Sequence, residues 1–409
     1  MQLSGRAAVL TPFVAIADDI EANIVILPGV DGAIVLVGLD TLFSSQEFET
    51  LVLSHIDERE RGKIAAIFFI ASHTHNAPAL DPGKPRLGVA DADHMADVAS
   101  RVGKRISQAA RTRSLSVHVQ RGDDRCELNV MRRRKGWRLR PRWPFLSRGV
   151  NMTPDTAAVI PQELKVVVAR DADGLAQWVV WTWCCHPTAF PEFGNVSADF
   201  PGTVRRAIRE HLGSPDLPVV FLPGFCGDVR ADPSILPVSF RSLAQTPFQR
   251  PFARATERNY ARLCEALSRA VRAAIDRCGA AEALAPARAA TVTFPLERIL
   301  AGNHNAGDRN EVAVSCIEAG PVGFLLVGAE VCSIYVGKCL ELISRDWLVS
   351  GYTGQVFGYL PDNNQVKEGG YEAEGFFPLF GLEGRFSTEV EAPFLDAVRA
   401  ASRRISCNE

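Results

Sequence analysis

The sequence lacks most features that would assign it to a specialised class of protein. It has no run of about eighteen apolar residues, so no membrane-spanning helix is expected. None of its 10 Cys forms a C-x-x-C pair, and the adjacent Cys184 and Cys185 lie within an apolar run, so the cysteines are interpreted as small buried hydrophobes. No secretory apolar core follows the start. A reducing cytoplasm is therefore the expected location.

The chain also lacks a large excess of positive or negative charge. The formal net charge is -2 over 409 residues, so no whole-chain field attracts nucleic acid or membrane. A hydrophobic content of 47% and a charged content of 22% are ordinary for a globular protein. Candidate strands and helices alternate along most of the chain. This order predicts an α/β fold, with a mixed β-sheet core covered by helices on both faces.

Three apolar runs are each followed by residues of the kinds that bind metals. The runs and these residues are Ile64–Ala71 with His73 and His75, Trp178–Cys185 with His186, and Val322–Ala329 with Glu330. Short apolar runs of this kind are typical of buried strands. Functional groups of α/β proteins collect where strands end. Two or three His with one carboxylate are the ligands of a catalytic zinc site, so we predict such a site at these strand ends.

Each of these residues also has a purely structural interpretation. His73 and His75 are two residues apart, so on an extended backbone both rings lie on one side and can approach one metal or substrate; either can instead be a hydrogen-bonded strand-end residue. His186, taken alone, is more often structural. Glu330 can bind a metal, or can be a first-turn carboxylate favoured by the dipole of a helix expected over 331–345. Asp228, in a Gly-rich turn, can close that turn or hold a second metal.

The stretch 131–143 reads MRRRKGWRLRPRW and holds seven basic residues. It is interpreted as a solvated basic loop. A contact with a membrane surface or an anionic substrate is the second interpretation. No nucleic-acid motif surrounds it, so no nucleic acid is expected as a partner.

The order of these segments resembles the neutral/alkaline (non-lysosomal) ceramidases, zinc amidohydrolases that cleave the N-acyl bond of ceramide. The family's Thr-His-Thr-His-Ser-Gly-Pro motif is similar to 72–78, Ser-His-Thr-His-Asn-Ala-Pro, and its His-Pro-Thr is similar to 186–188. Its Pro-Gly-Glu motif is similar to 328–330, Gly-Ala-Glu. Its ligand Tyr is followed twelve residues later by Tyr-Glu, as Tyr359 is followed by Tyr371 and Glu372.

The resemblance implies roles for these residues. The implied zinc ligands are His73, His186, Glu330 and Tyr359. The implied catalytic residues are His75 as the proton carrier, Tyr371 on the oxyanion side, and Arg132, from an Asn-Val-Met-Arg stretch similar to the family's Asn-Ile-Asn-Arg, as a substrate-positioning residue. Gly224 stands where the family has a Ser that has been proposed as a nucleophile. A zinc-activated water needs no such serine.

The resemblance thus implies a zinc-dependent hydrolase of linear amide bonds, acting on a ceramide-like or other N-acyl lipid in sphingolipid or lipid metabolism. We expect one catalytic domain over residues 1–409, without the family's C-terminal immunoglobulin-like domain. Two alternatives remain. One is a metallohydrolase of a non-lipid amide, peptide or ester, with one or two metals. The other is a non-catalytic lipid-binding relative.

Overall fold

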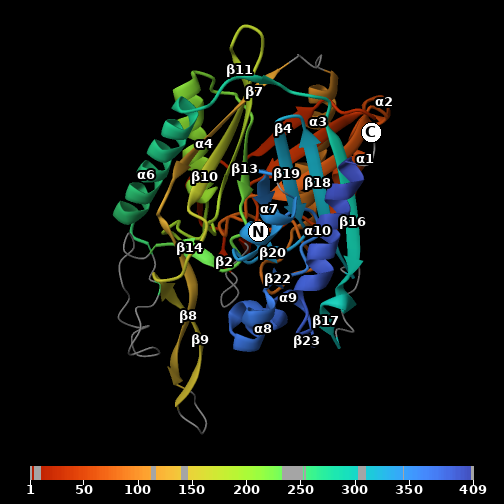
Figure 1. The fold of residues 1–409 in the computed structure, drawn as a ribbon. Coiled ribbons are helices and arrows are strands. Elements are labelled where there is room, and N and C mark those ends of the chain that lie inside the picture. The colour runs from red at the N-terminus through yellow and green to blue at the C-terminus, as the bar shows by residue number, and fades with distance from the viewer. Residues whose placement is uncertain are drawn as a thin grey trace.

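The computed structural model describes residues 2–3, 11–111, 117–139, 146–232, 252, 255–302, 310–343 and 345–406 (Figure 1). Three mixed sheets form its centre. The first, in the order β13-β11-β10-β7-β15, consists of β7 (His118–Arg125), β10 (Glu163–Arg170), β11 (Ala176–Trp183), β13 (Val219–Pro223) and β15 (Glu282–Ala283). The second, in the order β16-β18-β19-β21, consists of β16 (Arg288–Pro295), β18 (Glu311–Ala319), β19 (Val322–Val327) and β21 (Leu348–Ser350).

The third sheet is buried on both faces, and its alternate residues belong to two different apolar cores. It consists of β4 (Ala22–Leu27), β5 (Ala33–Leu39) and β6 (Ile64–Ala71). Side chains alternate along a strand. Ile34 and Leu36 accordingly join the apolar core shared by all three sheets, whereas Val35 and Val37 join a separate core beneath helices α1 (Gln46–Ser54) and α3 (Ala92–Arg111).

Helices cover the outer faces of the other two sheets in the same way. Helices α4 (Asp199–Leu212) and α6 (Glu257–Asp276) pack on the first sheet. Helices α7 (Tyr335–Ile343) and α10 (Glu391–Ser406) cover the second. The predicted α/β fold with a mixed sheet core is thus confirmed. Among the helices described, none combines the length and apolarity that a membrane crossing requires.

Shorter elements complete the described structure. The short helices are α2 (Glu58–Arg61), η1 (Leu296–Arg298), α8 (Asn363–Glu368), the π-helical turn η2 (Tyr371–Gly375) and α9 (Phe377–Phe380). Four two-stranded pairs are β1 (Gln2–Leu3) with β2 (Thr11–Pro12), β3 (Ala15–Ile16) with β12 (Asn195–Val196), β17 (Leu300–Ala301) with β23 (Arg385–Phe386), and β20 (Glu330–Val331) with β22 (Tyr359–Leu360).

The basic stretch 131–143 is not a loop as expected. Its first nine residues belong to β8 (Asn129–Leu139), which pairs with β9 (Leu146–Asp155) and with β14 (Val229–Ala231). The β8–β9 hairpin projects from the body of the molecule (Figure 1). Residues 140–143 lie outside the described part. The expected helix over 331–345 is also shorter, since a strand occupies Glu330–Val331 and α7 begins only at Tyr335.

Candidate metal centre

The loop after β6 holds His73 in an unusual backbone conformation. Its φ is 65°, in the left-handed region, which costs a residue with a side chain roughly 1–2 kcal/mol. The backbone N–H donates to the carbonyl oxygen of Thr41 at 2.9 Å, and ring Nδ1 lies 3.0 Å from the carbonyl oxygen of Leu42. Because a carbonyl only accepts, Nδ1 carries the proton and Nε2 presents its lone pair.

His186, three residues after the end of β11 at Trp183, is held in the same manner. Its backbone N–H donates to the carbonyl oxygen of Val229 at 3.1 Å. Its ring Nδ1 lies 2.6 Å from the carbonyl oxygen of Cys226, which again leaves Nε2 as the atom with a lone pair. Both rings are about 1% exposed, so these lone pairs face a protein interior that excludes water.

Glu330 and Tyr359 join these histidines from the short β20–β22 pair. They are direct neighbours in its parallel register. Glu330 Oε2 lies 3.2 Å from Nε2 of His186 and 3.5 Å from Nε2 of His73. The Tyr359 hydroxyl lies 3.5 Å from Nε2 of His186. Four potential ligand atoms from separate parts of the chain thus converge on one buried point.

The spacing of these atoms can be compared with that of a real zinc site. Ligand atoms at about 2.0–2.1 Å from a tetrahedral zinc are about 3.3–3.4 Å apart. The three separations of 3.2, 3.5 and 3.5 Å observed here lie close to that value. The donor types also fit, since neutral imidazole and carboxylate are common zinc ligands. The residues present could therefore hold a metal with little rearrangement.

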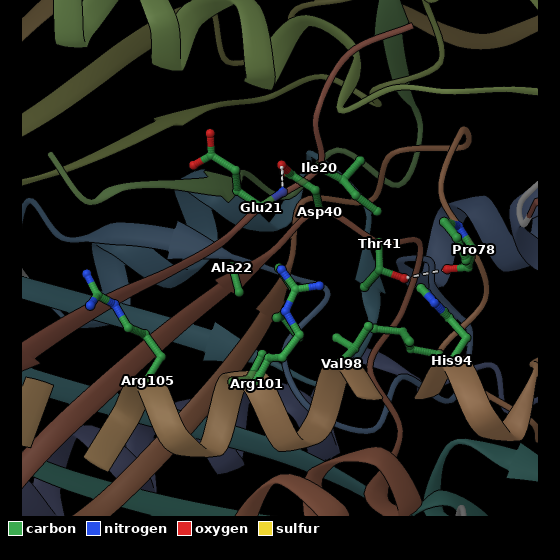
Figure 2. A pocket seen from close by; sticks show the side chains of 13 residues that line it. Ile20, Glu21, Ala22, Asp40, Thr41, Pro78, His94, Val98, Arg101 and Arg105 are labelled. Carbon is green, nitrogen blue, oxygen red and sulfur yellow. Dashed lines mark hydrogen bonds between the residues drawn. The ribbon is translucent and has the colours of Figure 1, made fainter. Parts of the chain in front are cut away.

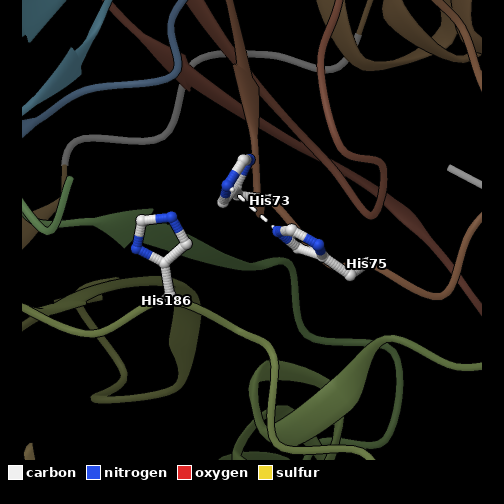
Figure 3. A group of neighbouring side chains, drawn as sticks. All are labelled: His73, His75 and His186. Atoms are coloured by element: carbon white, nitrogen blue, oxygen red, sulfur yellow. Dashed lines mark hydrogen bonds between the residues drawn. The ribbon is translucent and has the colours of Figure 1, made fainter. Parts of the chain in front are cut away.

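His75 lies beside this group rather than apart from it. Its Nε2 is 3.3 Å from Nε2 of His73, and unlike the other two rings it is only half-buried. Figure 3 shows the rings of His73, His75 and His186 around a common space, and one ligand atom from each lies within 4.8 Å of the others. His75 is thus placed between the buried atoms and solvent.

The electrostatics of the centre favour a bound cation. Burial lowers the pKa of His73 to about 3, although the charge of Glu330 opposes the shift. Burial, together with the charge of Arg132, lowers the pKa of His186. Burial raises the pKa of the Glu330 carboxyl. The histidines are therefore neutral, and a buried carboxylate without a cation is unfavourable. A divalent cation stabilises this combination.

Strand β8 brings Arg132 against the tyrosines of the centre. Its guanidinium carbon lies 5.4 Å from the ring centroid of Tyr359 and 5.5 Å from that of Tyr371. Its Nε donates to Glu372 Oε1 at 2.7 Å. The other carboxylate oxygen of Glu372 accepts from Arg133 Nη1 at 2.6 Å. Nη2 of Arg132 is buried and has no hydrogen-bond partner among the described residues. This leaves one buried donor beside the centre for a ligand.

Asp228, considered above for a second metal, is placed outside this set. Its Oδ1 accepts from the backbone N–H of Ser333 at 2.7 Å and its Oδ2 from Gln365 Nε2 at 2.8 Å. Its carbonyl oxygen accepts from the N–H of Arg132 at 2.8 Å. Asp228 therefore connects the loop after β13 to β8, to the segment before α7 and to α8, and so helps to position Arg132.

Tyr352 is a residue of the centre that sequence reasoning missed. Its hydroxyl donates to Glu330 Oε2 at 3.4 Å and lies 3.4 Å from Cys226 Sγ. Its ring centroid lies 4.1 Å from that of His73, and its φ is 57°. The only sequence signal is a tyrosine within a glycine-rich stretch, 351–358, which by itself predicts a turn.

A separate cavity lies beside helix α3, which contributes His94, Val98, Arg101 and Arg105 to its lining (Figure 2). It has a volume of about 460 Å³ and is lined by apolar side chains together with Asp40, His94, Arg101 and Arg105. Thr41 and Pro78 line it and are joined by a 3.3 Å hydrogen bond. None of the metal-centre residues lines this cavity.

Comparison with known proteins places the fold. No protein-family model and no curated protein sequence matches the chain. The solved structure "Ceramidase complexed with C2" superposes with a TM-score of 0.74 at 12% identity, covering 98% of this chain and 72% of that one. A neutral ceramidase from Pseudomonas aeruginosa superposes with a TM-score of 0.66, also at 12% identity, covering 96% of this chain and 74% of that one. The chain thus has the fold of neutral ceramidases.

Proposed function

We propose that the protein is a zinc-dependent amidohydrolase that cleaves the N-acyl amide bond of a ceramide-like or other N-acyl lipid. The observation that carries the proposal is the convergence of His73, His186, Glu330 and Tyr359 on one buried point, with separations of 3.2 to 3.5 Å. The fold adds support, because solved structures that share it are ceramidases.

In this proposal the four converging residues hold the zinc. The carbonyl oxygens of Leu42 and Cys226 fix the two imidazoles in the tautomer that directs Nε2 inward, as outer carbonyls do in metal sites. Bound zinc supplies Lewis acidity, which activates water and polarises the amide carbonyl. The low exposure of the ligands keeps competing solvent away from the reacting atoms.

His75 is the proposed proton carrier. It is the least buried of the three histidines and lies 3.3 Å from His73, so it can exchange protons with solvent. A base at this position takes a proton from the attacking water and returns one to the leaving amine. The amine must be protonated because an amide anion is a poor leaving group.

Tyr371 is the proposed partner of the substrate oxygen, and Arg132 is the proposed substrate-positioning residue. Burial raises the pKa of Tyr371 to about 12, so its hydroxyl keeps its proton at neutral pH and can donate to a developing oxyanion. Nη2 of Arg132, which has no hydrogen-bond partner among the described residues, lies on the same side of the centre and is available to hold another part of the substrate. The Tyr371 hydroxyl is fixed by packing before the substrate arrives, which is what makes oxyanion stabilisation effective.

The test is turnover of the purified, zinc-loaded protein against a panel of N-acyl amides that includes ceramide, short-chain N-acyl amides, peptides and esters. Release of fatty acid from an N-acyl lipid, lost on chelation and restored by zinc, is the expected result. A protein that binds these lipids, holds zinc and releases no acid would be the non-catalytic relative instead.

A further inference from the structure

The metal centre is flanked by two arginines of a small sheet. Arg230 of β14 is opposite Val130 of β8 in the antiparallel register. Arg132 is two positions along from Val130, at a β-bulge in the pairing of β8 with β9, and its charge acts on Arg230. Diagonal neighbours of this kind have backbones about 7–8 Å apart, a distance that two arginine side chains span easily. Both arginines therefore border the same space beside the centre.

The buried carboxylates nearby already have partners. Asp228 accepts from Ser333 and Gln365, and Asp199 accepts from the backbone N–H groups of Ala189 and Phe190. Glu372 is shared, with one oxygen on Arg132 at 2.7 Å and the other on Arg133 at 2.6 Å. Glu330 belongs to the proposed zinc ligands, and its single charge is outweighed by a divalent ion. Nη2 of Arg132 has no hydrogen-bond partner within the described ranges. An additional anion would therefore satisfy a buried donor that the described carboxylates leave open.

Arg230 is the clearer case, because the described part of the chain gives it no carboxylate partner. Its Nε donates to Thr188 Oγ1 at 3.1 Å, and its guanidinium carbon lies 4.9 Å from the ring centroid of Phe252. Burial, followed by the charge of Arg132, lowers its pKa to about 10, still far above neutrality. It is therefore a charged guanidinium on a partly exposed residue.

Arg230 is also close to the proposed zinc ligands. The residue before it, Val229, accepts the backbone N–H of His186 at 3.1 Å. Thr188, which holds its Nε, is two residues after His186. Arg132 reaches the ring of Tyr359. An anion bound by the two arginines would thus lie beside the proposed metal ligands.

On the basis of the proposed function, we infer that the substrate is an N-acylated amino acid, whose carboxylate binds between Arg132 and Arg230. The acyl portion of an N-acyl lipid is apolar, so the amine portion must carry the charge. Carboxylate suits this place because its two oxygens match the forked donors of guanidinium groups. The neutral hydroxyls of a ceramide headgroup would leave both arginines without a counter-charge in a partly dry site.

The reaction balances as a simple hydrolysis. The oxygen of water forms a bond with the acyl carbon, the bond between that carbon and nitrogen breaks, and the amine leaves with a proton from water. The products are a fatty acid and a free amino acid. Neither an oxidant nor a further reactant is needed.

The experiment compares two matched ligands, N-dodecanoylglycine, which is anionic, and N-dodecanoylglycinamide, which is neutral and nearly the same shape. Their dissociation constants for the zinc-loaded protein are measured by calorimetry, and kcat/KM is measured for each. Wild type should bind the anion on the order of tenfold to a hundredfold more tightly, as expected for hydrogen bonds to a charged group. Arg230→Gln should remove most of this preference, and Arg230→Lys should keep part of it. Arg269→Gln, an exposed change of the same kind on α6, should keep all of it.

The outcomes separate this inference from the proposed function. Equal binding of the two ligands by wild type would overturn the inference, whether or not either is hydrolysed and whether or not the variants fold. Equal preference in Arg230→Gln and wild type would also overturn it. Arg230-dependent binding of the anion without any hydrolysis would support the carboxylate site and count against the amidase. Hydrolysis of the neutral ligand with no preference for the anion would support the amidase and count against the carboxylate site.

Discussion

Glu330 and Tyr359 are opposite each other in the parallel register of β20 and β22. Each of these strands has two residues, so the pairing stabilises little by itself. Its effect is to place the carboxylate of Glu330 beside the phenol of Tyr359. The N–H of Glu330 also donates to the carbonyl oxygen of Gly358 at 2.8 Å, which fixes the same alignment. Half of the proposed ligand set therefore depends on one short contact between distant parts of the chain.

The first prediction concerns the metal. The purified protein should contain about one zinc per chain, because the four donors converge on a single point. His73→Ala or His186→Ala should lose most of it, since each removes a ligand whose tautomer is already fixed. His211→Ala, which changes a partly exposed histidine paired with Asp276, is the control and should keep full zinc. Elemental analysis after dialysis gives the answer. Full zinc in both ligand variants would exclude these residues as ligands.

The second prediction separates metal binding from chemistry. His75→Ala and Tyr371→Phe should keep zinc, because the proposed ligands remain in place. Each should lower kcat on the order of a hundredfold, the usual loss when a proton carrier or an oxyanion donor is removed. Zinc content and kcat are measured on the same preparations. Wild-type kcat in both variants would mean that neither residue acts in the transition state.

The third prediction concerns Tyr352, which no motif identified. Tyr352→Phe keeps the ring against His73 but removes the hydroxyl that donates to Glu330 Oε2. Zinc affinity should fall by roughly tenfold to a hundredfold, as it does when a group that orients a ligand is lost. Competition with a chelator of known affinity measures the change.

The matched control is Tyr335→Phe. The Tyr335 hydroxyl donates to the carbonyl oxygen of Pro361 at 3.0 Å and is equally buried, but it does not contact the centre. This variant should lose about 1 kcal/mol of unfolding free energy and keep its zinc affinity. Equal zinc affinity in both variants would show that the Tyr352 hydroxyl does not orient Glu330.

Sequence reasoning predicted the strands that precede the histidines, because buried strands of this kind are continuous apolar runs. Ile64–Ala71 is one uninterrupted apolar run, and β6 has these bounds. It failed where a tertiary contact decides the structure. The strand at Glu330–Val331 exists only through its pairing with β22, which local propensity does not reveal. In β8 the usual alternation of apolar and polar residues is absent, because the buried position 133 holds an arginine that is paired with Glu372. A charged residue at such a position is expected to be exposed, so the sequence suggests a loop.

The fourth prediction concerns pH and stability. Burial, aided by the charge of Asp81, raises the pKa of the Glu49 carboxyl from 4.5 to about 7. Between these values the folded state holds a proton that the unfolded state has released. The contribution of Glu49 to stability is therefore complete below pH 4.5 and declines as the pH rises towards 7, by at most about 1.4 kcal/mol per pH unit.

Glu49→Gln should remove this decline, because the amide does not ionise and still accepts from Ser44, whose hydroxyl lies 2.9 Å from Glu49 Oε1. The variant should become more stable relative to wild type as the pH rises from 5 to 8. Glu47→Gln, an exposed change on the same helix, should follow wild type. Urea unfolding at several pH values measures the difference. Parallel curves for wild type and Glu49→Gln would contradict the prediction.

The last prediction addresses nucleophilic catalysis. Cys226 is the candidate nucleophile in the loop that holds Gly224, where the resembling family has its proposed nucleophilic serine. A cysteine nucleophile needs a thiolate, which a neighbouring histidine or cation must stabilise. Burial instead raises the pKa of the Cys226 thiol to about 12, and the contact described for its sulfur is the Tyr352 hydroxyl at 3.4 Å. Cys226→Ala should therefore keep kcat within a few-fold of wild type, and mass spectrometry during turnover should find no acyl adduct. An adduct on Cys226, together with loss of activity in the variant, would replace the zinc–water mechanism with covalent catalysis.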